Sequence, residues 1–201
     1  MEILAKMKKL TLVLFILSIN CLTVNNILAQ GKFLLIVDVQ AKFYENTKIE
    51  SPANEMVQQI NQVIAKVEPE NVVYIKATGK NLSITFKGIK TTPMFPAPDL
   101  DSNLKIVSSN IFTKVEGDAF TVDSLNKFLT DNGAKEIIIV GLLAEKCVYN
   151  TAIGGKVKGY DVYIIPEAII SKSKEEKEKA FKKLTEKGIK ILPISEITHA
   201  S

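Results

Sequence analysis

Short apolar runs that alternate with amphipathic segments constrain the fold of this 201-residue chain more than any other feature. Runs such as 32–40 (KFLLIVDVQ) and 135–141 (KEIIIVG) are almost continuously apolar, which is typical of strands buried on both faces of a parallel sheet. Segments such as 51–67 repeat apolar residues at three- and four-residue spacing, which indicates helices. Because parallel neighbours need crossovers, the alternation predicts an α/β fold: three α/β/α layers around a doubly wound, mostly parallel, six-stranded sheet of Rossmann-like type.

The apolar patterns also predict where the individual elements lie. Strands are expected at 32–40, 71–77, 104–109, 135–141, 161–168 and 189–197, and helices at 51–67, 121–133, 147–160 and 173–188. Ser51 is expected to cap the first helix, with Pro52 at the first helical position. The helix that starts at Cys147 is expected to loosen at Gly154-Gly155. Region 78–103, rich in Pro, Gly and Thr, is predicted to be a long excursion over the sheet.

The first thirty residues are predicted to be a secretory signal segment. They combine a lysine-containing start, an apolar run and a small-residue region that ends at Ala29. The apolar run is short for a membrane span, which disfavours a transmembrane anchor. We therefore expect a signal at 1–30, translated from Met1 or Met7, and one exported, periplasmic or secreted domain at 31–201. A lipoprotein acylated at Cys21 is the less favoured alternative.

Composition and charge exclude several classes of function. The formal net charge is +4, acids and lysines are interspersed, and every basic residue is lysine. This balance predicts no nucleic-acid binding, no stable membrane insertion after signal removal, and no phosphate-rich ligand that needs an arginine fork. Catalysis by a Cys-His pair or a Ser-His-Asp triad would depend on His199 alone, because it is the single histidine of the sequence, and both are therefore disfavoured. Without CxxC, HExxH or a Cys/His cluster, the sequence predicts no metal site and no cofactor.

Three chemically active residues fall where ligands bind in such sheets, beyond the carboxyl ends of the strands. Asp38 ends the first strand, Lys114 follows the third and Cys147 follows the fourth. Each residue alone is more often structural, but together they supply what thiol catalysis needs. Lys114 and the helix N-terminus are expected to lower the pKa of Cys147, and Asp38 to accept and return a proton. Backbone N–H groups of Ala144 and Cys147 are expected to stabilise a developing oxyanion.

Segments 34–43 (LLIVDVQAKF), 111–120 (IFTKVEGDAF) and 137–168 resemble the three signature segments of the isochorismatase-like cysteine hydrolase superfamily, which includes nicotinamidases and N-carbamoylsarcosine amidohydrolases. The resemblance spans nearly the whole chain after residue 30. It implies a parallel six-stranded sheet between helices and a catalytic triad of Asp38, Lys114 and Cys147. It further implies a backbone oxyanion hole and a non-proline cis peptide bond, expected at Leu143-Ala144. The residues that it implies for the substrate pocket are Gln40, Phe43, Phe120 and Leu143.

The presence of Cys147 indicates which kind of bond is cleaved. Family members that hydrolyse amides keep it, so the resemblance implies hydrolysis of a small amide or related C–N bond through a thioester acyl-enzyme. Nicotinamidases also resemble one another in an Asp/His metal site after the second strand, but segment 75–93 here contains no histidine and no acidic residue. The family's usual Thr or Ser before the cysteine is Ala144, and its usual Asp after the fifth strand is Glu167. Nicotinamide is therefore a disfavoured substrate.

Two other classes of function stay open on the sequence. Ala144 and the arginine-free excursion are consistent with a non-catalytic member of the same scaffold that binds a ligand without turning it over. A single thiol in an oxidising compartment also allows a redox or peroxide-scavenging protein, the weaker alternative. The hydrolase prediction calls for a small-molecule substrate, and the resemblance also suggests a homo-oligomer.

Overall fold

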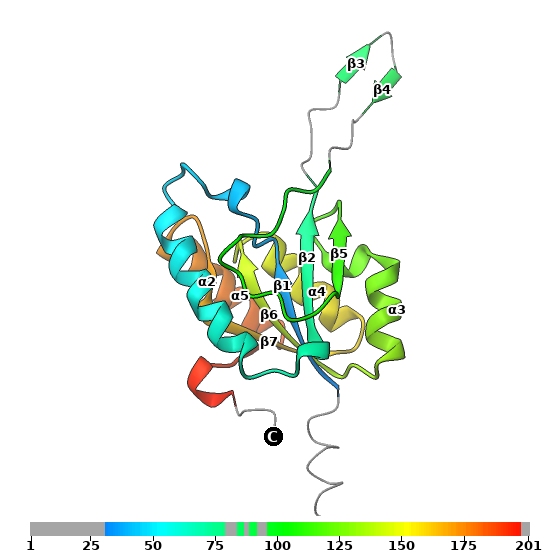
Figure 1. The fold of residues 1–201 in the computed structure, drawn as a ribbon, viewed down its shortest axis with the longest axis vertical. Coiled ribbons are helices and arrows are strands. Elements are labelled where there is room, and N and C mark those ends of the chain that lie inside the picture. Colours follow the sequence, from blue (N-terminus) through cyan, green and yellow to red (C-terminus); the bar gives the residue numbers. More distant parts are fainter. Residues whose placement is uncertain (1–30, 79–83, 87–88, 92–95, 198–201) are drawn as a thin grey trace, which may run out of the picture.

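A computed structural model describes residues 31–78, 84–86, 89–91 and 96–197 (Figure 1), so the predicted signal segment and His199 lie outside the described residues. The predicted fold class is confirmed. Six strands form one all-parallel sheet in the order β5-β2-β1-β6-β7-β8. The sheet strands are β1 (Lys32–Val37), β2 (Val72–Ala77), β5 (Ile111–Lys114), β6 (Glu136–Leu142), β7 (Asp161–Ile170) and β8 (Lys190–Ile191).

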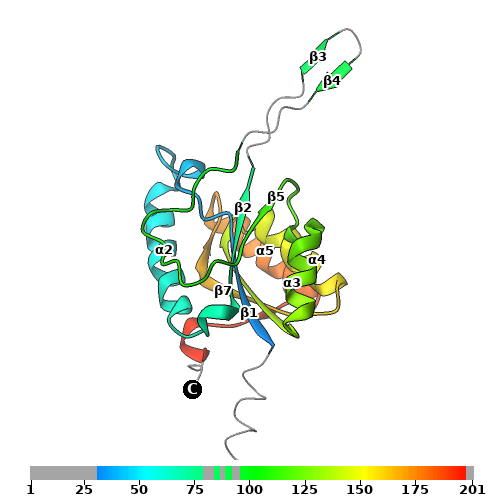
Figure 2. The same ribbon diagram turned by 45° about the vertical axis from the view of Figure 1, so that its right-hand side comes forward.

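Helices cover both faces of the sheet, as the apolar patterns predict (Figure 2). The α-helices are α2 (Glu50–Ile64), α3 (Asp123–Asp131), α4 (Cys147–Val157) and α5 (Lys174–Glu186). One apolar core lies between the sheet and α3, α4 and α5, and a second lies between the sheet and α2. Alternate residues of β1 serve the two cores: Phe33 and Leu35 face one, and Leu34 and Ile36 face the other. The central strands are therefore buried on both faces.

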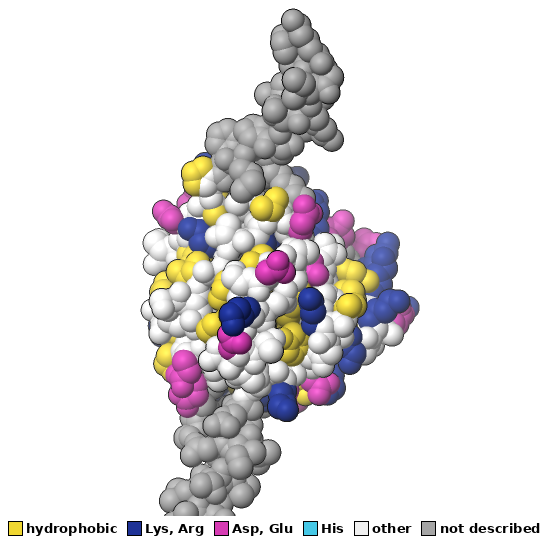
Figure 3. All heavy atoms as spheres, turned by 90° about the vertical axis from the view of Figure 1, so that its right-hand side faces the viewer, with side chains coloured by type: hydrophobic (Ala, Val, Ile, Leu, Met, Phe, Trp, Pro, Cys, Tyr) yellow, Lys and Arg dark blue, Asp and Glu magenta, His cyan; other side chains and the backbone are white. Residues whose placement is uncertain are grey.

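Short elements complete the chain trace. The 3-10 turns are η1 (Ala41–Phe43), η2 (Pro69–Asn71), η3 (Ala119–Thr121) and η4 (Ile194–Glu196). Within the predicted excursion, β3 (Ile84–Phe86) and β4 (Ile89–Thr91) pair as a separate antiparallel sheet. In the described residues, no helix has the length and apolar character that crossing a membrane requires. On the face shown in Figure 3, lysine and acidic side chains are interspersed.

The first helix begins earlier than Ser51. The Ala53 N–H donates to the Ile49 carbonyl at 2.9 Å, so Ile49 is the N-cap and the expected cap at Ser51 is wrong. Pro52 then lies within the first helical turn, where a missing N–H removes no helical hydrogen bond. The predicted helix is otherwise present.

The third strand of the sheet lies C-terminal to its predicted position. Tyr74 of β2 is in register with Ile111, whereas segment 104–109 forms no strand. That segment is attached to β2 by side-chain hydrogen bonds instead. Ser108 Oγ donates to the Val72 carbonyl at 2.6 Å, and Tyr74 Oη donates to the Lys105 carbonyl at 2.8 Å. The apolar composition of segment 104–109 therefore gave a wrong prediction of the strand's position. In the structure, Lys114 is the last residue of β5.

Gly141 allows β6 to approach β1 closely near the carboxyl end of the sheet. Its φ is +116°, and a Cβ there would lie 2.1 Å from the Val37 carbonyl oxygen. The register between β6 and β7 also shifts between Ile139 and Gly141. Pairing resumes at Gly141, and β6 ends at Leu142, just before the turn that precedes α4.

Helix α4 runs through Gly154-Gly155 without loosening, contrary to the prediction. Both glycines are sites of close packing. A Cβ at Gly154 would lie 2.2 Å from Asp118 Oδ2, and one at Gly155 would lie 2.9 Å from Phe120 Cε2. The glycines therefore let the loop after β5 pack directly against α4.

Candidate active site

Asp38 and Lys114 form a buried ion pair at the carboxyl ends of β1 and β5. Lys114 Nζ lies 3.0 Å from Asp38 Oδ2, and the two residues are 1% and 4% exposed. Lys114 Nζ also donates to the Glu116 carbonyl at 3.2 Å. Asp38 has a φ of +59°, a backbone conformation that Asp tolerates better than most residues. The turn at Asp38 thus ends β1 and leaves the carboxylate beside Lys114.

Cys147 is the first residue of α4 and joins this pair. It lines the same pocket as Asp38 and Lys114, and it is partly buried. The expectation of a lowered thiol pKa is wrong. Burial and the neighbouring Asp38 carboxylate raise the pKa of Cys147 to about 11, although Lys114 opposes the shift. The resting residue is therefore a neutral thiol, because at neutral pH desolvation and the carboxylate outweigh the lysine.

Asp38 keeps one oxygen available toward this thiol. Burial raises the pKa of Asp38, while the charge of Lys114 and hydrogen bonds from Cys147 and Lys114 oppose the rise. Oδ2 accepts from Lys114, and Oδ1 is buried without a strong hydrogen-bond donor among the described residues. A buried carboxylate oxygen without such a donor is a good acceptor for a proton from an adjacent group.

The backbone of the turn before Cys147 corrects two expectations. The Ala144 N–H donates to the Ile170 carbonyl at 2.8 Å, so it is not available to an oxyanion. Within the described part of the chain, neither the Leu143 N–H nor the Cys147 N–H donates to a backbone carbonyl outside the regular helices and strands. The non-proline cis peptide bond is Leu142-Leu143, one residue before the expected position.

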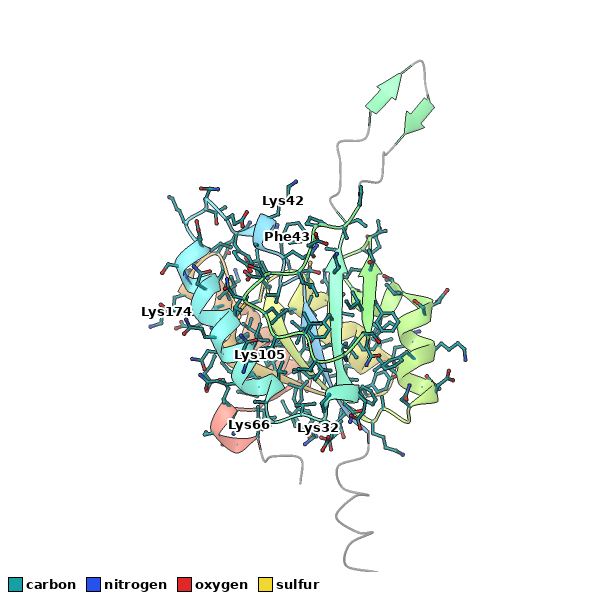
Figure 4. The ribbon with its side chains drawn as sticks, viewed as in Figure 1. Lys32, Lys42, Phe43, Lys66, Lys105 and Lys174 are labelled. Atoms are coloured by element: carbon teal, nitrogen blue, oxygen red, sulfur yellow. The ribbon has the colours of Figure 1, made fainter. Side chains whose placement is uncertain are left out.

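A pocket of about 720 Å³ opens above the three residues, at the carboxyl ends of β1, β2, β5 and β6. This is the switch point of the sheet, because chain order reverses between β1 and β6. Phe43 and Leu143, two of the residues that the family resemblance implies for the substrate pocket, line this pocket. Phe43 lies at the upper end of the sheet in Figure 4, and Lys32, at the start of β1, lies at the opposite end.

Gln40 and Phe120 do not line this pocket, contrary to the expectation. The fully buried Gln40 amide accepts from the Ala77 N–H at 2.7 Å and donates to the Pro98 carbonyl at 2.7 Å. Gln40 therefore joins the end of β2 to the returning loop. Phe120 is 3% exposed and packs against Tyr160, with ring centroids 5.6 Å apart. Its ring belongs to the core beside α4.

Other pocket residues carried no recognised sequence signal. Thr78, Glu116, Glu145 and Asn150 contribute polar groups to the lining. Asn150 could have been found from spacing, because it follows Cys147 by three residues and so lies on the same side of α4. The remaining residues depend on where loops place them, which local pattern does not specify.

No metal centre emerges from the described residues. Among them, no group of three or more His, Cys, Asp or Glu side chains could hold a metal ion. Segment 75–93, where the family resemblance implies an Asp/His site, contains no histidine and no acidic residue in its sequence. The donors of such a site are therefore missing from that segment.

Comparisons with known proteins agree with this fold. A secreted isochorismatase effector from Verticillium dahliae is 25% identical over 143 residues, which are 70% of this chain and 73% of the effector. A streptothricin hydrolase from Streptomyces noursei is 27% identical over 138 residues, 67% of this chain and 52% of the hydrolase. The chain thus spans about half of that hydrolase. The structure of a Pyrococcus horikoshii pyrazinamidase in complex with zinc is similar, with a TM-score of 0.63 and 24% identity over 81% of this chain and 99% of that one.

The family itself follows from the extent of the match. The isochorismatase domain family matches residues 32–196, from the first strand to the last 3-10 turn. Because this match covers most of the chain, the protein belongs to the isochorismatase family of hydrolases.

Proposed function

We propose that this protein is a cysteine amidohydrolase that cleaves a small amide or related C–N bond through a thioester acyl-enzyme. The observation that carries the proposal is the buried Asp38–Lys114 ion pair beside Cys147 at the base of a pocket. A thiol, a base and a fixed cation are the groups that acyl transfer by a thiol requires. Two of the similar proteins are named as a streptothricin hydrolase and a pyrazinamidase, and these names are consistent with a hydrolytic reaction.

In the first step, Cys147 Sγ attacks the carbonyl carbon of the amide while its proton passes to Asp38. Because the thiol pKa is raised to about 11, this proton transfer accompanies the attack instead of preceding it. We assign stabilisation of the carbonyl oxygen to the N–H groups of Leu143 and Cys147, since the Ala144 N–H is already bonded. Lys114 compensates the carboxylate charge until the proton arrives.

The remaining steps return the site to its starting state. Asp38 gives its proton to the leaving nitrogen as the C–N bond breaks, which leaves a thioester on Cys147. Water then attacks the thioester carbon and transfers a proton to Asp38. When the C–S bond breaks, that proton returns to the sulfur and a carboxylic acid is released. No other reactant is needed, because the net reaction is hydrolysis.

We also propose that the protein is exported from the cytoplasm. The predicted signal at 1–30 motivates it, and the relative from Verticillium dahliae is named as secreted. The test is whether the expressed chain is recovered outside the cytoplasm with residues 1–30 removed. Intact chain that stays in the cytoplasm would contradict export without affecting the hydrolase assignment.

The experiment for the hydrolase function is a screen of small primary amides and ureido compounds, with released ammonia as the readout. The full chain carries Cys21→Ser, so that Cys147 is its sole thiol. We expect turnover of at least one compound, trapping of an acyl group on Cys147, and no turnover by Cys147→Ala with an unchanged circular dichroism spectrum. Activity retained by Cys147→Ala would refute the mechanism. Binding without turnover by the unmutated protein would favour a non-catalytic ligand-binding protein instead.

A further inference from the structure

Glu145 lines the pocket but takes no part in the proposed chemistry. It lies in the turn between β6 and α4, two residues before Cys147. Its carboxylate reaches the end of β7, the neighbouring strand. Ser171 Oγ donates to Glu145 Oε2 at 2.7 Å, and the Lys172 N–H approaches Oε1 at 3.5 Å. Both oxygens of Glu145 therefore face donors that follow β7.

Backbone hydrogen bonds act on the same turn. The Ala144 N–H donates to the Ile170 carbonyl at 2.8 Å, which attaches the turn to the last residue of β7. Within the turn, the N–H groups of Lys146 and Val148 donate to the Leu143 carbonyl at 2.9 and 3.2 Å. The turn is thus internally closed, and Glu145 adds a side-chain attachment to the backbone attachment at Ile170.

The attached turn leads directly into Cys147, the first residue of α4. Asp38 and Lys114 are fixed by β1 and β5, and their ion pair holds them together. Cys147 reaches them from a different part of the chain, at the first residue of α4, so its distance from Asp38 depends on the turn. We propose that Glu145 is a positioning residue that, through Ser171, holds residues 143–147 so that Cys147 faces Asp38. The inference rests on the proposed function, in which Cys147 is the nucleophile.

The proposal concerns geometry and not the charge of Glu145. Besides burial, the groups that shift the pKa of Cys147 are Asp38 and Lys114. A neutral side chain of the same shape should therefore replace Glu145. Glutamine keeps an oxygen that can accept from Ser171, whereas alanine keeps no acceptor.

The experiment compares Glu145→Ala, Glu145→Gln and Ser171→Ala in the full chain carrying Cys21→Ser. For an amide that the protein hydrolyses, Glu145→Ala and Ser171→Ala should lower kcat by about 10- to 100-fold, with KM changed less than about two-fold, because small misplacements of reacting groups are costly. Glu145→Gln should retain most of the activity. Ser171 is not part of the pocket lining, so Ser171→Ala tests the attachment apart from substrate contact. The double variant Glu145→Ala/Ser171→Ala should be no slower than Glu145→Ala.

A second measurement needs no substrate. The pH dependence of iodoacetamide alkylation should show the thiol pKa of Glu145→Ala and Ser171→Ala shifted from about 11 toward the ordinary 9.0. A displaced thiol loses part of its burial, which is the largest cause of the raised pKa, and it moves away from Asp38. Glu145→Gln should keep the raised value. Since this readout does not involve an amide, it tests the positioning even if the protein hydrolyses none.

Three outcomes would overturn the proposal. One is that Glu145→Ala leaves both kcat and the thiol pKa unchanged. Another is that Glu145→Gln is as impaired as Glu145→Ala, which would assign the effect to charge. The third is a lower melting temperature of Glu145→Ala and Ser171→Ala with an unmoved thiol pKa, which would make the Glu145–Ser171 bond a contribution to stability alone.

Discussion

Lys114 Nζ and Asp38 Oδ2 lie 3.0 Å apart, although 76 residues separate them in the chain and both side chains are almost completely buried. A buried charge is tolerated when a partner compensates it, and removing one partner leaves the other uncompensated. The pair therefore couples the chemistry of the site to the stability of the fold.

Lys114→Met should destabilise the protein by about 3 kcal/mol at pH 7, because it leaves the Asp38 carboxylate buried without a cation. Without Lys114, the folded-state pKa of Asp38 lies further above the unfolded value of 3.8. The folded state then binds the proton more tightly than the unfolded state, so the deficit is smallest near pH 4 and grows as the pH rises. Urea unfolding at pH 4 and pH 7 measures this difference.

Lys32→Met is the matched control for that experiment. Lys32 pairs with Glu136 at 3.3 Å, but both side chains are more than a third exposed. Exposed pairs contribute at most about 1 kcal/mol, so this variant should stay close to the unmutated protein at both pH values. Equal losses in the two lysine variants would show that burial of the Asp38–Lys114 pair has no special cost.

The thiol of Cys147 should react slowly with iodoacetamide at pH 8, and its rate should rise toward an apparent pKa of about 11. Relative to the ordinary value of 9.0, this shift reduces the thiolate fraction at pH 8 by about 100-fold. Asp38→Asn keeps the burial, which is the largest cause of the raised pKa, but it removes the carboxylate that adds to the shift and keeps the opposing Lys114. We therefore expect Asp38→Asn to be alkylated at least about 10-fold faster at pH 8.

Mass spectrometry of chain carrying Cys21→Ser follows this alkylation at a single thiol. The denatured chain supplies the reference rate, since its thiol has neither burial nor a fixed carboxylate. A folded protein whose Cys147 is alkylated as fast as the denatured chain would contradict the raised pKa.

The proposed hydrolysis should lose kcat/KM in acid with a limb above pH 3.8, the ordinary aspartate pKa. Asp38 must be ionised to accept the thiol proton, and burial raises its pKa, so it becomes protonated at a higher pH than a solvated aspartate does. Asp38→Asn should abolish the limb together with nearly all activity. A kcat/KM that stays constant down to pH 4 would argue against Asp38 as the base.

Gly141→Ala should be among the most destabilising single substitutions in the central sheet, by about 3 kcal/mol or more. The added Cβ would lie 2.1 Å from the Val37 carbonyl oxygen, and the φ of +116° is unfavourable for alanine. Gly133→Ala is the control, because Gly133 also has a positive φ, +68°, but nothing lies within 4 Å of its added Cβ. That variant should lose about 1 kcal/mol. Equal melting temperatures for the two variants would contradict the close approach of β6 and β1.

The sequence predicted the sheet and the three central side chains because their signals are local. A buried strand such as 32–37 shows as a continuous apolar run, and Asp38 directly follows it. The prediction of the third strand was wrong for the same reason: segment 104–109 contains the apolar pair Ile106-Val107, yet these two residues are 50% and 40% exposed. Pairing with β2 selected residues 111–114 instead, and long-range pairing leaves no mark on local composition.

The finer features of the site depend on competing interactions between residues that are distant in the sequence, and no local sequence pattern shows these. The direction of the Cys147 pKa shift follows from burial and the Asp38 charge against Lys114, and these become known only with the positions of all three. Gln40 and Phe120 were expected in the pocket because they match positions in the signature segments of the family. Which way each side chain turns was decided by the backbone of Ala77 and by the ring of Tyr160.

The raised pKa of Cys147 has a consequence for the protein's durability. Oxidants attack thiolates much faster than thiols, and a sulfinic or sulfonic acid at this position would be irreversible damage. In the folded chain, the burial and the carboxylate that hold the proton on Cys147 also keep its sulfur in the form that oxidants attack slowly. We therefore expect Cys147 to be oxidised by peroxide more slowly in the folded chain than in the unfolded chain.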